Sequence, residues 1–141
     1  MEKFIISIYE LFVDGSLLDD LDKKGLILPL FFPLTLIPLA WVGTFYYLIN
    51  SARFCKKRHW VLTMLISALI VFVVNLSTCM SMAGKQILKD IDNVNAGFLF
   101  NQGIPVFLLF GFIMFLGACL FFLIFSIILK WWSTNCRKTP F

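Results

Sequence analysis

The chain is divided by its charged residues, because three long stretches contain no Asp, Glu, Lys, Arg or His. These stretches are residues 25–52, 60–84 and 93–129. About 20 apolar residues, rising about 1.5 Å each in a helix, cross the hydrocarbon core of a bilayer. We therefore predict an all-α integral membrane protein in which residues 25–132 form a three-helix transmembrane domain. The predicted spans are Leu26–Asn50, Trp60–Met82 and Ile104–Lys130.

The first 24 residues carry a different pattern. Apolar side chains recur there at the spacing of one helix face, at Phe4, Ile5, Ile8, Leu11 and Phe12. We predict an amphipathic, acidic tail over residues 1–24, whose N-terminal helix lies in the membrane interface. Packing of the same face on another protein is an open alternative. The segment lacks the pattern of a cleavable signal peptide, so we expect it to be retained.

The middle span carries a stripe of mostly small or polar side chains at intervals of three or four residues. Small and hydroxyl-bearing side chains on one face let helices approach and bond to each other in lipid. Asn75 is the most polar group near the middle of the membrane, where polar groups are candidates for function. Packing is favoured over transport for a single amide. We predict a helix–helix interface, or a pore lining, at Thr63, Ser67, Asn75, Thr78 and Ser81.

The other two spans differ from the middle one. Pro29, Pro33 and Pro38 predict a kinked or late-starting first helix, because proline lacks the backbone N–H and clashes with the preceding turn. A tolerated bend near the outer end is favoured over a functional hinge. The third span distributes phenylalanines on all sides and has no clear polar face. Gly111 and Gly117 are six residues apart, which is not the spacing of close helix dimers. We therefore expect the third helix to be the most exposed to lipid.

Basic residues predict the orientation. Arg53, Lys56, Lys57 and Arg58 crowd the first connector, which we expect on the cytoplasmic side. Three spans then place a short basic C-terminal tail, residues 133–141, in the cytoplasm, and residues 1–24 outside. The connector is also a candidate site for anionic lipid headgroups. Aromatic side chains favour the membrane–water interface, and the predicted anchors are Trp60, Trp131 and Trp132.

Composition supports the same class of protein. Hydrophobic residues make up 60% of the chain and charged residues 14%, whereas soluble domains have about 45–50% and about 25%. A water-soluble enzyme, a nucleic-acid-binding protein and a disordered linker are excluded as leading interpretations. The net charge of +4 comes from basic residues that flank apolar runs, so we expect no nucleic acid as a partner.

Signatures of catalysis and metal binding are missing from the sequence. His59 is the only histidine, and the four cysteines show no Cys-x-x-Cys spacing. The acidic clusters at residues 19–22 and 90–92 lack the alternating pattern of a calcium loop. We therefore predict no catalytic residue, no metal and no cofactor, and a protein that is not an enzyme.

In size and number of spans the chain is similar to small bacterial inner-membrane proteins. Examples are immunity proteins against pore-forming bacteriocins, exclusion proteins of phages and plasmids, and minor subunits of envelope machines. This resemblance rests on no diagnostic motif and transfers no residue role. We predict a non-enzymatic protein of the bacterial inner membrane that acts by helix-mediated assembly, with lipid and either further copies or other membrane subunits as partners. The alternative is a self-assembling pore of the holin or viroporin kind.

Overall fold

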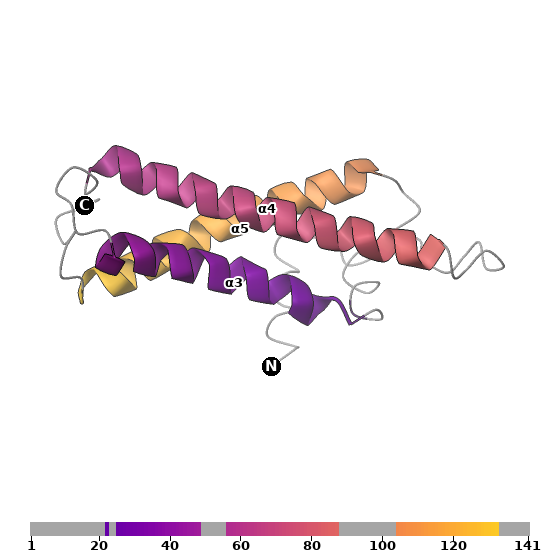
Figure 1. Cartoon of the computed structure of the whole chain (residues 1–141), viewed down its shortest axis with the longest axis horizontal. Coiled ribbons are helices and arrows are strands. Elements are labelled where there is room, and N and C mark those ends of the chain that lie inside the picture. The colour runs from indigo at the N-terminus through magenta and orange to yellow at the C-terminus, as the bar shows by residue number, and fades with distance from the viewer. Residues whose placement is uncertain (1–21, 23–24, 49–55, 88–103, 133–141) are drawn as a thin grey trace. The chain divides into compact units, whose positions relative to one another are not determined.

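The computed structural model describes residues 22, 25–48, 56–87 and 104–132, with side chains throughout except at residues 83–87. All regular elements in these ranges are helical. They are the α-helices α3 (Ile27–Gly43), α4 (Lys57–Ile87) and α5 (Ile104–Lys130), and the π-helical turn η1 (Thr44–Leu48), which continues α3 (Figure 1).

Each of these helices is long and apolar enough to cross a membrane. The candidate spans are Ile27–Leu48, Lys57–Met82 and Ile104–Lys130, with 22, 26 and 27 residues. At about 1.5 Å per residue, each exceeds the thickness of about 30 Å that a hydrocarbon core presents. The prediction of three apolar helices in a membrane-embedded protein is confirmed. The predicted amphipathic helix, Arg53 and the tail of residues 133–141 lie outside the described residues.

The helix ends differ from the predicted limits by a few residues. Helix α4 begins at Lys57 and continues to Ile87, beyond the predicted Trp60–Met82 at both ends. Hydropathy marks only the part of a helix that suits lipid, whereas backbone hydrogen bonds continue the helix into polar sequence. At the other end of the chain, Gly25 precedes α3 with a φ of 65° and donates its N–H to the carbonyl of Asp22, 2.9 Å away. Glycine adopts this left-handed conformation without the steric cost that a side chain adds.

Each helix buries roughly every fourth residue. In and before α3 these positions are Leu26, Leu30, Leu34, Pro38 and Val42. In α5 they are Phe110, Met114, Ala118, Phe122 and Ser126. Side chains four apart lie on the same face of a helix. Each helix therefore presents one stripe to the interior and exposes aliphatic and aromatic side chains elsewhere.

The chain divides into two compact units, and each of the three helices contributes one segment to each unit. Unit 1 falls within Met1–Pro33 and Phe72–Ile113, and unit 2 within Leu34–Val71 and Met114–Phe141. In unit 1 the buried apolar side chains include Leu30, Phe107 and Phe110. The core of unit 2 is a cluster made by Val42, Phe45, Tyr46, Trp60 and Phe122.

Candidate functional site

Ser126, near the end of α5, forms hydrogen bonds with side chains from two other helical elements. Its Oγ accepts a hydrogen bond from Trp60 Nε1 at 2.9 Å and shares a second hydrogen bond with the Tyr46 hydroxyl at 2.7 Å. All three side chains are buried. We call Ser126, Tyr46 and Trp60 the Ser126 cluster. Because η1, α4 and α5 each supply one member, the cluster ties the three helices together within unit 2.

Aromatic packing fixes the geometry of the Ser126 cluster. The rings of Trp60 and Phe122 meet edge to face with their centroids 5.6 Å apart. Phe45 and Tyr46 do the same at 5.2 Å, with perpendicular ring planes. Edge-to-face pairs are favoured because the positive ring edge meets the negative ring face. The hydrogen-bonding groups of Trp60 and Tyr46 are thus held in place by rings that have little freedom to turn.

The π-helical turn η1 explains how two consecutive residues enter the interior. Phe45 and Tyr46 are adjacent in sequence, yet both are fully buried. The wider π turn places neighbouring side chains closer in direction than an α-helix does. Thr44, the first residue of the turn, bonds through Oγ1 to the carbonyl of Ala40 at 2.9 Å. π-helical segments are rare and frequently lie at functional sites, so η1 directs attention to the Ser126 cluster.

The predicted stripe on the middle helix follows a graded pattern of burial. Ser67 and Asn75 are fully buried, Thr63 and Thr78 are half-buried, and Ser81 is exposed. Three hydroxyls of this stripe bond within α4. They donate to main-chain carbonyls three or four residues earlier: Thr63 to Trp60, Ser67 to Met64 and Thr78 to Val74, each at 2.8 Å. Such bonds satisfy the hydroxyl without a partner helix.

Asn75 is the exception in this stripe. Its side chain has no exposed surface, and neither Nδ2 nor Oδ1 has a hydrogen-bond partner among the described residues. Burying an amide without a partner costs about 1–3 kcal/mol by protein mutational data. Asn75 belongs to unit 1. The buried Ser126 of unit 2 therefore has hydrogen-bond partners among the described residues, whereas the buried Asn75 of unit 1 has none.

The prolines of the first helix are accommodated in three places. Pro29 is the third residue of α3 and is exposed, so its missing N–H falls in the first turn, where no intrahelical acceptor exists. Pro33 and Pro38 lie inside α3, which remains helical past both. Pro38 is fully buried on the inward stripe of the helix.

The predicted anchors divide into two kinds. Trp131 and Trp132 follow α5 with exposed fractions of 75% and 70%. Trp60, by contrast, is 6% exposed, because its ring packs on Phe122 and its N–H is bonded to Ser126. Sequence assigned Trp60 to the interface, and the structure gives it a place in the core of unit 2.

Both glycines of α5 contact another helix in the structure, although their spacing predicted little contact. A Cβ at Gly111 would lie 2.9 Å from Cε2 of Phe72, closer than real contacts allow. A Cβ at Gly117 would lie 3.3 Å from Cδ1 of Leu34. Each glycine leaves room for one side chain of a different helix, a contact on which the spacing of dimer motifs does not bear.

The Ser126 cluster was missed by sequence reasoning, although a signal was present. Ser126 carries the only hydroxyl, amide or charged side chain between Gln102 and Lys130. A single polar group does not form a stripe, so periodicity overlooks it. In a span this apolar, however, one hydroxyl needs a partner in lipid.

The chemistry that the described residues offer is neutral hydrogen bonding inside an apolar bundle. Cys79 and Cys119 are free thiols, the first buried and the second half-buried. No group of three or more His, Cys, Asp or Glu side chains that could hold a metal ion lies in the part of the chain that the structure describes. Fold and site together define a membrane-embedded helical protein. Comparison with family models, curated proteins and solved structures found no match.

Proposed function

We propose that this chain is a non-enzymatic three-span membrane protein that acts through helix contacts, as a subunit or regulator of a membrane complex or as an immunity or exclusion protein. The observation that carries the proposal is the burial of Ser67 and Asn75 inside one copy of the chain. Between Val61 and Val73, the side chains that α4 leaves exposed are aliphatic, at Val61, Leu62, Leu65, Ile66, Leu69 and Val73. Such a surface suits lipid tails or an apolar helix of a partner.

The same observation weighs against a self-assembling pore. A pore built from this chain needs Asn75, Thr78 and Ser67 around a water-filled axis. Ser67 and Asn75 have no exposed surface, and the hydroxyls of Ser67 and Thr78 already bond to carbonyls of α4. A pore therefore requires α4 to turn its inward stripe outward, which breaks the packing that buries these residues.

For orientation we propose the bacterial inner membrane, with the N-terminus outside and the C-terminus in the cytoplasm. The support is the concentration of Lys and Arg near the first connector and after α5. The test uses Ser16→Cys and Ser133→Cys in a chain whose native cysteines are replaced by alanine. An impermeant thiol reagent applied to intact cells should label position 16 alone. Labelling of position 133 alone would reverse the orientation.

Site-specific photocrosslinking tests the assembly proposal. A photoreactive residue at Leu65 or Leu69 should give a crosslinked complex of defined mass, because both positions face outward. The matched position Ser67 should give none, since it faces inward. Native mass measurement of the purified complex must then show a fixed stoichiometry.

Membrane potential separates the two functions. Under the assembly proposal, expression leaves the potential unchanged in wild-type and Asn75→Leu cells. If wild-type expression collapses the potential and Asn75→Leu prevents the leak, the pore function is correct and assembly is wrong.

A further inference from the structure

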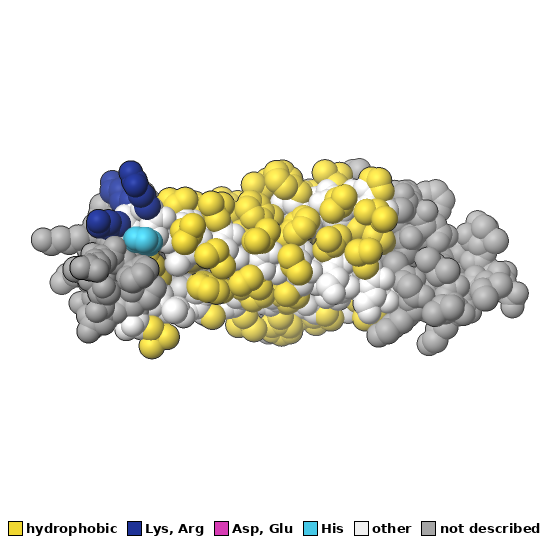
Figure 2. Space-filling model, turned by 45° about the horizontal axis from the view of Figure 1, so that its top comes forward, with side chains coloured by type: hydrophobic (Ala, Val, Ile, Leu, Met, Phe, Trp, Pro, Cys, Tyr) yellow, Lys and Arg dark blue, Asp and Glu magenta, His cyan; other side chains and the backbone are white. Residues whose placement is uncertain are grey.

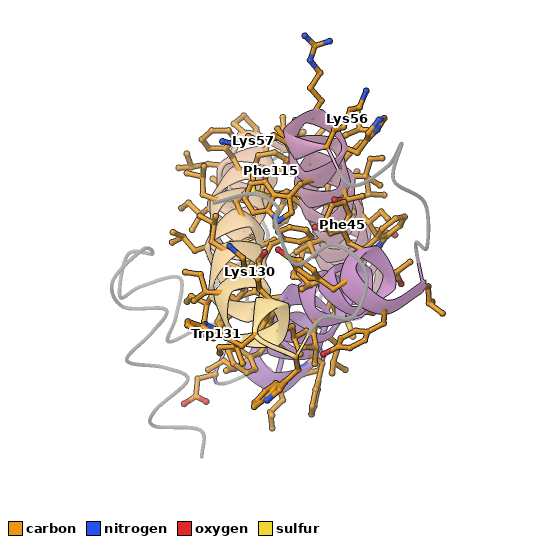
Figure 3. The ribbon with its side chains drawn as sticks, turned by 90° about the vertical axis from the view of Figure 1, so that its left-hand side faces the viewer. Phe45, Lys56, Lys57, Phe115, Lys130 and Trp131 are labelled. Atoms are coloured by element: carbon orange, nitrogen blue, oxygen red, sulfur yellow. The ribbon has the colours of Figure 1, made fainter. Side chains whose placement is uncertain are left out.

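One end of unit 2 carries a dense group of positive charges. Lys56, Lys57 and Arg58 lie at the start of α4 and are exposed, and Lys130 is the last residue of α5. We call these four residues the basic end. Figure 2 shows the Lys and Arg side chains at one border of the apolar surface, and Figure 3 shows Lys56, Lys57 and Lys130 from that side.

The Ser126 cluster brings the start of α4 and the end of α5, which carry the basic end, to the same end of unit 2. The indole N–H of Trp60 bonds to the Ser126 hydroxyl at 2.9 Å, which fixes the start of α4 against the last turns of α5. Lys56 precedes Trp60 by four residues, and Lys130 follows Ser126 by four. Four residues rise about 6 Å along a helix. The two lysines therefore lie about one turn beyond the bonded pair, on the side of unit 2 that Figure 3 shows.

The segments that form unit 2 contain no Asp or Glu side chain. They hold seven Lys and Arg residues and no Asp or Glu, whereas the segments of unit 1 hold five Lys and all eight acidic residues. Exposed cations in the first turn of α4 therefore face the positive end of their own helix dipole without a neighbouring acid on that helix turn.

The first turn of α4 strengthens the preference for an anion. The main-chain carbonyl of Lys56 accepts hydrogen bonds from the N–H groups of His59 and Trp60, at 3.0 and 3.2 Å, which makes Lys56 the N-cap residue. A lysine side chain has only donors, so it does not cap the free N–H groups of the turn as Ser or Asp does. Three cations and a helix N-terminus thus point to the same kind of ligand.

We propose that the basic end binds the phosphate groups of anionic phospholipids in the leaflet where α4 begins. Two features select a lipid over a free anion. Trp131 and Trp132 are exposed beside Lys130, as aromatic residues at the border between headgroups and acyl chains are. Val61 and Leu62, one turn further along α4, are also exposed, and they offer a surface for the acyl chain. This inference does not depend on the assembly proposal.

A lipid titration of the purified full-length protein tests the inference. Native mass spectrometry in neutral detergent measures the binding of phosphatidylglycerol and of phosphatidylcholine to each variant. Wild type should prefer phosphatidylglycerol. The triple variant Lys56→Gln, Lys57→Gln, Arg58→Gln should lose about fivefold in affinity per charge, on the order of 100-fold in total, and its binding of phosphatidylcholine should not change.

Two matched variants separate a site from general electrostatics. The charge-retaining variant Lys56→Arg, Lys57→Arg, Arg58→Lys should keep the preference. The variant Lys23→Gln, Lys24→Gln, Lys85→Gln removes the same number of charges from the segments of unit 1 and should also keep it. An equal loss in this last variant would overturn the inference, as would a wild type that does not distinguish the two lipids.

Two further measurements address the binding of a soluble anion in place of a lipid and the unfolding of the triple variant. Glycerol 3-phosphate, used as a competitor at the same concentration, should not displace phosphatidylglycerol. Displacement at equal affinity would show a site for soluble phosphate and refute the lipid assignment. Thermal unfolding shows whether the triple variant is folded. If it is not, the salt dependence of phosphatidylglycerol binding to wild type tests the inference instead. Binding must weaken between about 50 and 300 mM salt, as screening of exposed charges requires, and unchanged affinity would exclude the basic end.

Discussion

The two units bury polar side chains in opposite ways. In unit 2, Ser126 receives the indole N–H of Trp60 and shares a hydrogen bond with Tyr46. In unit 1, Asn75 is equally buried, but its amide has no partner among the described residues. A satisfied cluster stabilises a fold, whereas an isolated amide opposes it. The difference indicates that buried polar groups stabilise unit 2 through the Ser126 cluster, whereas burial of the Asn75 amide opposes the stability of unit 1.

The largest expected effect comes from removing the indole of unit 2. Trp60→Ala should lower the free energy of unfolding by about 3–5 kcal/mol, because it deletes a buried ring and a hydrogen-bond donor together. Denaturant titration in detergent micelles measures this change. Trp131→Ala is the control, since the ring is mostly exposed and its loss should change stability by less than about 0.5 kcal/mol. Equal effects of the two substitutions would refute the distinction between core and interfacial tryptophans.

A smaller loss is expected from the hydroxyl alone. Ser126→Ala keeps the volume nearly constant but leaves Tyr46 and Trp60 without their shared partner, which should cost about 1–2 kcal/mol. Ser77→Ala, at an exposed position of α4, should be close to neutral. The same unfolding titration compares the two variants. If Ser126→Ala is neutral as well, the Ser126 cluster does not stabilise unit 2.

The opposite sign is expected in unit 1. Asn75→Leu replaces an amide that has no hydrogen-bond partner among the described residues by an apolar side chain of similar size, and should raise the free energy of unfolding by about 1 kcal/mol. Ser67→Ala should leave it nearly unchanged, because the Ser67 hydroxyl bonds only to a carbonyl of its own helix. A loss of 1 kcal/mol or more in Asn75→Leu would mean that the amide is satisfied, and the contrast between the units would fail.

The smallest effects come from a series of glycines. Gly43→Ala should stabilise by up to about 1 kcal/mol, since its Cβ meets no atom within 4 Å and alanine favours helix. Gly117→Ala should be close to neutral, because the end of the Leu34 side chain can shift to admit the added methyl group. Gly111→Ala should destabilise, as its Cβ meets the ring of Phe72 at 2.9 Å. Thermal unfolding midpoints rank the three variants, and a midpoint for Gly111→Ala at or above that of Gly43→Ala would contradict the close packing in unit 1.

The positions of the helices were accessible from sequence, because charged residues are excluded from lipid and mark the ends of each span. Which face of a helix turns inward was much harder to predict. In the first and third helices almost every residue is apolar, so the interior stripes through Leu34 and Met114 do not differ in hydropathy from exposed neighbours such as Leu36 and Leu116. Only the middle helix carries enough polar residues for a periodic pattern.

In the candidate site, too, some residues could be predicted from sequence and others could not. Ser67 and Asn75 stand out in sequence by their polarity, and the structure places both in the interior. The partnership of Trp60 with Ser126 joins residues 66 positions apart, and no local pattern predicts such a contact. General preferences of tryptophan for interfaces even indicated the wrong surroundings for Trp60. That Asn75 has no hydrogen-bond partner among the described residues depends on its neighbours in space, which composition and periodicity do not predict.

The Ser126 cluster also has a consequence for biogenesis. Helices enter the membrane in the order of synthesis, and Ser126 belongs to the third helix, 66 residues after Trp60 and 80 after Tyr46. Until that helix is inserted, the indole and the phenol of the first two helices lack this oxygen. A nascent chain that stops before residue 126 therefore lacks the oxygen that joins the first two helices to the third in the completed protein.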